Sequence, residues 1–257
     1  MRRRLGQALR IGVSPRAVAL VATSRFSRSQ VTVVAEQRCA DGAIDTICAS
    51  VRGLLADAGC DGRPVSFVIA DELARLWQVA PPPGSARLAD LEAAAGLRFQ
   101  TLYGEAPLAW KVVADYATDT PFMAAALPRQ LLALLEQGAA AHRLTVVEVV
   151  PQFVAGWNRW RAALKADSWY GLVQEGVLTL GAGGAVRPIA LPPDAGSAWI
   201  AQQIEREALR LNLPVPGRLM VSGDVPESWS NGAQCTVLGE RADWSPAVRL
   251  AVTGSAA

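Results

Sequence analysis

The residue types that most often perform chemistry in proteins are scarce in this chain. It has one histidine, His142, and four cysteines, Cys39, Cys48, Cys60 and Cys235. No two cysteines have the CxxC spacing of a zinc site, and one histidine cannot complete a usual zinc set with them. Ser-His and Cys-His nucleophile pairs are excluded unless His142 itself serves, and that residue ends a predicted helix, where an imidazole interacts favourably with the helix dipole. The sequence therefore predicts no catalytic residue and no metal site.

Carboxylates are the next candidates for chemistry. Glu72, Glu105, Asp115 and Asp119 lie in the middle of the chain and could supply a general acid and a general base. No spacing among them places two on one face of a well-marked helix or strand. We therefore expect no acid–base pair from these residues.

A glycine-rich string, Leu180 to Gly184, offers two interpretations. Glycines that follow a strand can cradle a phosphate when a helix begins immediately after them. The residues that follow, AVRPIAL, have the pattern of a strand, and Pro188 argues against a helix there. The string favours a hairpin turn over a phosphate loop.

The composition indicates a folded protein without affinity for nucleic acid. The 257 residues are 51% hydrophobic and 19% charged, and the formal net charge is only +2, with acids and bases scattered along the chain. No apolar run approaches the roughly 20 residues that cross a bilayer, and the opening residues lack the apolar stretch of a signal peptide. We expect a cytoplasmic protein with free, buried thiols. The early arginines, Arg2, Arg3, Arg4 and Arg10, favour a solvated terminus over a phosphate or lipid contact.

The first seventy residues predict a layered α/β unit. Apolar, β-branched runs predict two antiparallel strands after a short lead-in, and apolar residues at i, i+3, i+4 and i+7 predict a helix that stops at Gly59. A continuous apolar run then predicts a strand buried on both faces. In chain order these segments are residues 11–13, 17–26, 30–38, 43–59 and 65–70.

The middle of the chain predicts an inserted subdomain. A proline-rich connector leads into a helix, and two strand-like runs follow it. A further helix, a strand and a helix that opens at Pro151 return the chain to the first unit. These segments are residues 85–104, 110–116, 122–128, 128–142, 144–150 and 151–160.

The pattern of the opening then returns in outline. Three short strands, a helix and a strand are predicted, followed by a weak pair of strands, which suggests an internal duplication with a shortened second copy. The segments are residues 168–176, 177–184, 185–191, 194–212, 218–223, 234–239 and 248–252.

This order of elements resembles the actin-like ATPase superfamily, and within it the pilus assembly protein PilM and the cytoplasmic domain of the secretion protein GspL. The segments that carry the resemblance are IGVSPRAVALV at 11–21, RFQTLYGEAPLAWKVVADY at 98–116, FMAAALPRQLLALLE at 122–136 and LTVVEVVPQFVAGWNRW at 144–160. It implies two ribonuclease H-like lobes. We expect a first lobe at 10–165 with a subdomain inserted at about 78–127, and a truncated second lobe at 166–257.

The chain departs from that superfamily at its nucleotide motifs. Where the resemblance implies an aspartate that orients Mg²⁺ between glycines, this chain has Val13, Ser14 and Pro15, and proline lacks an N–H donor. The second loop keeps only Glu175 and Gly176, and the adenosine motif survives in part at Gly223. We therefore expect no ATP hydrolysis and no resident cofactor.

Two alternatives stay open at this point. In one, the chain binds Mg-ATP through Ser14, Arg16, Glu175, Gly176 and Gly223 and acts as an inactive regulator. In the other, it is a divergent ATPase or sugar kinase in which Asp115 or Glu175 replaces the missing acid.

The resemblance also implies partners. PilM-like proteins hold the cytoplasmic tail of an inner-membrane assembly protein, PilN-like in type, in a groove beside the inserted subdomain. An assembly ATPase and a second copy of the chain are further expected partners, and the chain would associate with the inner membrane through a partner. Trp77, Trp110 and Tyr116 border the insertion and are our candidate partner-binding residues, although tryptophans are also common in cores.

Overall fold

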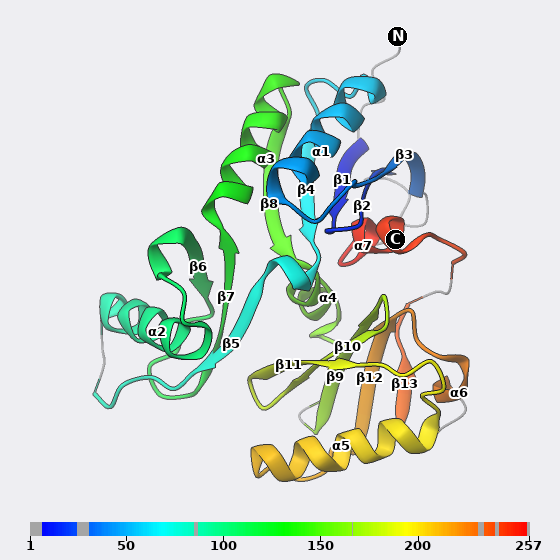
Figure 1. The fold of residues 1–257 in the computed structure, drawn as a ribbon. Helices are drawn as coiled ribbons and strands as arrows, with labels where there is room; N and C mark the ends of the chain where they lie inside the picture. Colours follow the sequence, from blue (N-terminus) through cyan, green and yellow to red (C-terminus); the bar gives the residue numbers. More distant parts are fainter. Residues whose placement is uncertain are drawn as a thin grey trace.

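We describe a computed structural model that covers residues 7–24, 31–84, 87–165, 167–230, 234–239 and 242–255. Figure 1 shows two large sheets, one above the other in that view, and a smaller unit that projects to the side. Arg2, Arg3 and Arg4 lie outside the described residues. Within these ranges, the helices are too short or too polar to cross a lipid bilayer.

The first sheet has five strands in the order β3-β2-β1-β4-β8. The first three are antiparallel neighbours, and β4 and β8 continue the sheet in parallel with β1. The predicted lead-in is wrong: it is β1, a strand of seven residues at the centre of the sheet, whose apolar run is interrupted by Arg10. The strands are β1 Gln7–Val13, β2 Ala17–Ser24, β3 Val31–Arg38, β4 Pro64–Ile69 and β8 Thr145–Pro151.

Helices cover both faces of this sheet. On one face, α1 (Ile44–Ala58) and α3 (Arg129–Ala141) enclose the largest apolar core, which includes Cys48 and Cys60. Helix α1 ends as expected at Gly59, which has a left-handed φ of 57°. The other face is covered by the last helix of the chain.

That last helix, α7 (Pro246–Val252), corrects the strand predicted at residues 248–252. The Ser245 hydroxyl accepts a hydrogen bond from the Val248 N–H, and Pro246 occupies the first turn, so the segment has a helix start that outweighs its β-branched residues. The helix leaves the second lobe and packs on the first sheet. Helix α7 therefore follows the second lobe in the sequence but belongs to the packing of the first lobe.

The contact between α7 and β1 is unusually close. A Cβ atom at Gly12 would lie 2.6 Å from the Ala247 carbonyl oxygen and 2.7 Å from the Ala251 nitrogen. Beside it, Arg10 is 9% exposed and donates to the Ala251 and Thr253 carbonyl oxygens at 2.8 and 2.6 Å. Arg10 is therefore a buried clamp on the end of α7, and the expected solvated position is wrong for this arginine.

The inserted subdomain is a three-stranded antiparallel sheet with one helix on it. The strand order is β5-β7-β6, and α2 covers one face. Strand β5 was not predicted, because its five residues mix charged, polar and apolar types. The elements are η1 Asp71–Leu73, β5 Arg75–Val79, α2 Leu88–Tyr103, η2 Pro107–Ala109, β6 Trp110–Ala114 and β7 Phe122–Pro128.

The second large sheet repeats the topology of the first. Its order is β11-β10-β9-β12-β13, again with three antiparallel strands followed by parallel ones. Helix α4 connects the lobes, and α5 covers one face of the second sheet. The elements are α4 Gln152–Trp160, β9 Ser168–Gln174, β10 Val177–Ala182, β11 Ala185–Ala190, α5 Ser197–Leu211, β12 Arg218–Gly223, α6 Glu227–Ser230 and β13 Cys235–Val237.

Candidate functional site

The side chain of Ser14 forms hydrogen bonds with the backbone of its own turn, which lies between β1 and β2. The Ser14 hydroxyl oxygen accepts hydrogen bonds from the Arg16 and Ala17 N–H groups at 3.3 and 3.0 Å, and the hydroxyl donates to the Ala17 carbonyl at 2.9 Å. Pro15 has no N–H to offer. The backbone donors that a phosphate loop would present are therefore occupied by the serine of the same turn.

The corresponding turn of the second lobe lies between β9 and β10. Its two residues, Glu175 and Gly176, have left-handed φ angles of 46° and 76°. This pair of angles is typical of a two-residue hairpin turn, and Gly176 adopts its angle without steric cost. The turn therefore fixes the position of Glu175, whose side chain is 18% exposed.

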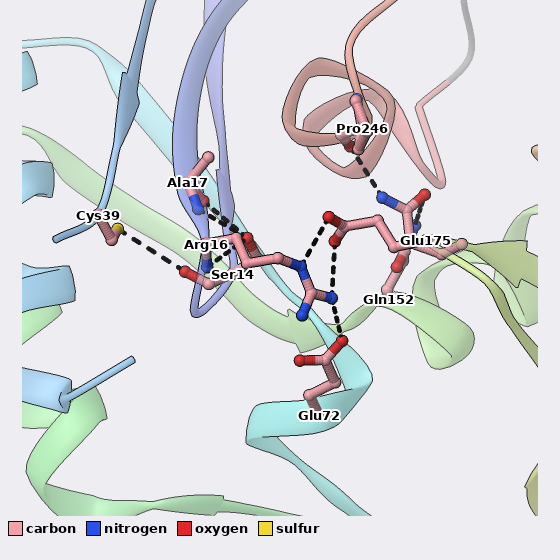
Figure 2. A network of polar contacts seen from close by, with 9 residues as sticks. Ser14, Arg16, Ala17, Cys39, Glu72, Gln152, Glu175 and Pro246 are labelled. Atoms are coloured by element: carbon pink, nitrogen blue, oxygen red, sulfur yellow. Dashed lines mark hydrogen bonds and ion pairs between the residues drawn. The ribbon is translucent and has the colours of Figure 1, made fainter. Parts of the chain in front are cut away.

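Arg16 joins the two turns. Its Nε and Nη2 atoms donate to the two carboxylate oxygens of Glu175 at 2.8 and 3.2 Å, and Nη2 also contacts Glu72 from η1 (Figure 2). The hydrogen bond to Glu175 is the main cause that raises the pKa of Arg16 above its usual value. We call this contact between Arg16, Glu175 and Glu72 the Arg16 clasp. It fills the space between the turns with a cation that belongs to the chain itself.

A layer of glutamines lies beside the clasp. Gln152, at the start of α4, is 1% exposed and donates to Gln174 at 3.4 Å and to the Thr253 hydroxyl at 3.1 Å. Gln174 in turn donates to the Pro246 carbonyl at 2.9 Å. These bonds tie α4, β9 and α7 together, so both chain crossings between the lobes are fixed near the clasp.

Asp71 is an acid with a strongly raised pKa that lies where the two lobes meet. One carboxylate oxygen accepts from the Phe153 N–H at 3.0 Å, in the first turn of α4, and the other accepts from the Thr179 hydroxyl of β10 at 3.5 Å. Burial of the carboxylate raises its pKa to about 7. Part of the residue reaches the surface, while the carboxylate lies enclosed between α4 and β10. Asp71 thus links the root of the insertion to both lobes.

A large groove opens between the inserted subdomain and the two lobes. Its volume is about 740 Å³, and it is lined by β6 and β7, by α3, β8 and α4, and by the β10–β11 turn. Its lining is mostly apolar and includes Val113, Met123, Phe153 and Trp157. We call it the insertion groove, and its size is in the range of ligand-binding pockets.

Comparisons with known proteins identify the fold. Neither a protein-family model nor a curated protein matches the sequence. The cytoplasmic domain of EpsL, an inner-membrane component of the type II secretion system of Vibrio cholerae, superposes with a TM-score of 0.60 at 12% identity, over 97% of this chain and 94% of that one. A protein of Bacteroides thetaiotaomicron with an actin-like ATPase fold gives a TM-score of 0.57 at 9% identity, over 90% of each chain. The chain has an actin-like ATPase fold.

A third similar structure is the PilM-PilN type IV pilus biogenesis complex. It gives a TM-score of 0.53 at 15% identity, over 84% of this chain and 81% of that one. The predicted actin-like fold is therefore confirmed.

Four of the five residues assigned to the alternative nucleotide site come together in this actin-like chain. Ser14, Arg16, Glu175 and Gly176 form the two facing turns. The fifth, Gly223, ends β12 with φ at 93°, and a Cβ atom there would lie 2.1 Å from the Val173 carbonyl oxygen. The close crossing of two backbones therefore accounts for Gly223 without a nucleotide.

The structure places the candidate partner-binding residues in the core of the inserted subdomain. Trp77 and Trp110 are 2% and 7% exposed and pack around Phe99 of α2, with ring centroids 5.2 and 5.5 Å from it. Tyr116 is half-buried against Phe122 of the same core. The three rings belong to the core of the subdomain and are not among the residues that line the groove.

The groove residues that sequence reasoning missed were detectable only in part. The odd-numbered residues of β6, Lys111 and Val113, point away from the α2 core, and Val113 is 57% exposed. Alternation along residues 110–114 gives this face once the strand is known. Trp157 of α4 reaches the groove from another part of the chain, and no local signal in the sequence indicates that contact.

Proposed function

We propose that this chain is a non-catalytic assembly protein of a pilus or secretion machine, and that it binds the cytoplasmic tail of an inner-membrane partner in the insertion groove. The groove is the observation that carries the proposal, because it is a concave, mostly apolar surface of about 740 Å³ beside the insertion. The similar PilM structure is that of a complex with PilN, and EpsL is an inner-membrane component of a secretion system. The tail would hold the chain at the membrane.

The groove suits a short, largely apolar peptide. Val113 and Met123 from the insertion and Phe153 and Trp157 of α4 all line the cavity, so the partner's apolar side chains would leave water on several sides. Charged and polar groups at the rim, such as Lys111, would fix the direction of the peptide.

The Arg16 clasp supports the absence of catalysis. Phosphoryl transfer requires Mg²⁺ and free groups that position the phosphates. Glu72 and Glu175 both pair with Arg16, and the Ser14 turn uses its own N–H donors. Asp115, the other substitute acid considered, lies on the insertion and lines the groove. We therefore propose that Mg-ATP is neither hydrolysed nor bound.

The test uses the purified chain and a peptide from the cytoplasmic tail of a membrane protein encoded beside it. Binding is followed by isothermal titration calorimetry and by the intrinsic tryptophan fluorescence of the chain, to which Trp157 in the groove contributes. Val113→Glu should weaken binding at least tenfold, because it places a charge on the apolar wall. Leu97→Glu is the matched control, since Leu97 is 67% exposed on α2 and does not line the groove.

Two results would contradict this function. An unchanged affinity for Val113→Glu would remove the groove as the binding site. A thermal shift with Mg-ATP, together with phosphate release that Glu175→Ala abolishes, would favour the divergent ATPase instead.

A further inference from the structure

Strand β10 of the second lobe contacts the first lobe at both of its ends. At one end, the Glu175–Gly176 turn enters the Arg16 clasp. At the other end, the Gly183–Gly184 turn meets the insertion, where Gln78 of β5 donates to the Gly183 carbonyl at 2.6 Å. The clasp and the far turn are therefore joined by a single six-residue strand.

The far turn is shaped for this contact. Gly183 and Gly184 have φ angles of 55° and 82°, which confirms the hairpin interpretation of the glycine-rich string. A Cβ atom at Gly184 would lie 2.8 Å from the Gln78 side-chain nitrogen, so the turn touches the insertion with almost no space between them. Gly184 also lines the insertion groove, and the turn is therefore part of the groove wall.

Strand β10 is held firmly along its length. It pairs with β9 on one side and β11 on the other, and Leu178 and Leu180 are buried in the core of the second lobe. Gly181 packs on the ring of Phe153, which is itself a groove residue. A strand that is paired on both sides moves as a unit with its sheet, so a displacement at one turn must reach the other.

We propose that Arg16 is a positioning residue for the insertion groove: by holding Glu175, it sets through β10 the place of the Gly183–Gly184 turn in the groove wall. This inference rests on the proposed function, since it describes the regulation of the same groove. By linkage, if the clasp raises the affinity of the groove for a peptide by some factor, the bound peptide must strengthen the clasp by that same factor. The ion pair that stands between the two turns thus regulates a site one strand away.

Hydrogen exchange followed by mass spectrometry tests the inference without any peptide. In Arg16→Ala, amides in residues 183–186 should exchange about fivefold faster, which corresponds to about 1 kcal/mol at 1.4 kcal/mol per tenfold. Exchange in α2, on the far side of the insertion, should be unchanged. Arg143→Ala is the matched control, because Arg143 pairs with Asp61 at 3.0 Å entirely within the first lobe.

Glu175→Gln approaches the same clasp from the second lobe with little change of shape and should reproduce the effect. A fivefold loss of peptide affinity in both variants, with the affinity of Arg143→Ala intact, would complete the case. Unchanged exchange at residues 183–186 in both variants would overturn the inference even if the peptide binds normally. Faster exchange there in a chain that binds no tail peptide would instead refute the proposed function and leave the mechanical link standing.

Discussion

The β1–β2 and β9–β10 hairpins occupy the same topological place in the two lobes, but different interactions stabilise their turns. In the first, the Ser14 hydroxyl satisfies the backbone and Arg16 projects a cation. In the second, two residues with left-handed φ make a tight turn that projects the carboxylate of Glu175. Two copies of one element have therefore become complementary in charge.

Charge complementarity between the two hairpins allows an actin-like chain to hold its two lobes together with its own side chains. A duplicated fold places two turns face to face, and a bound ligand can bridge them when both turns present donors. Here the bridge is an arginine and a glutamate, and Gln152 and Gln174 fix the crossings beside it. The joint becomes part of the folded protein.

The largest expected effect breaks the support of the first hairpin. Gly12→Ala would place a Cβ against backbone atoms of α7, and we expect a loss of about 3 kcal/mol in the free energy of unfolding, measured by urea denaturation. Gly96→Ala is the control: it lies in α2, where an added Cβ would meet no atom within 4 Å, and it should stabilise by about 0.5 to 1 kcal/mol. Equal effects of the two changes would contradict the close contact between α7 and β1.

A smaller effect concerns the bond between Asp71 and the second hairpin's strand. Because the folded chain holds the proton of Asp71 up to about pH 7 and the unfolded chain releases it near pH 4, stability should fall as pH rises between these values and level off above them. We expect on the order of 2 kcal/mol, since partial access to solvent reduces the full effect. Asp71→Asn retains an acceptor for the Phe153 N–H and should flatten this part of the pH profile of urea midpoints. A profile identical to that of the unmodified chain would show that another group titrates there.

The smallest effects sharpen the contrast between the turns. Ser14→Ala removes the hydroxyl that closes the first turn and should cost about 1 kcal/mol. Gly176→Ala should cost a similar amount, about 1 kcal/mol, because of its left-handed φ, whereas Gly176→Asn should recover part of the loss. Thermal unfolding of the three variants measures these differences. A full loss in the asparagine variant would mean that space, and not φ, requires glycine.

Most of the elements and the actin-like order could be predicted from the sequence. Alternation and helical periodicity found both copies of the repeat, and Val13, Ser14 and Pro15 showed that the first turn lacks a metal-binding acid. These features are local, because a residue's type and its near neighbours decide them. Strand β5 was missed because a segment of five residues takes its form from what it packs against. Helix α7 was missed because its β-branched residues were given more weight than the local helix start at Ser245 and Pro246.

The contacts of Arg16, Asp71 and Trp77 could be seen in the folded chain alone. Arg16 meets a carboxylate 159 residues away, and Asp71 meets the first turn of α4 82 residues away. Tryptophan is a residue type common at protein interfaces, but Trp77 is buried under α2 and packs on Phe99 in the core of the insertion. Pairings of this kind depend on how two sheets and an insertion are placed in space, and that placement results from burial summed over the whole chain.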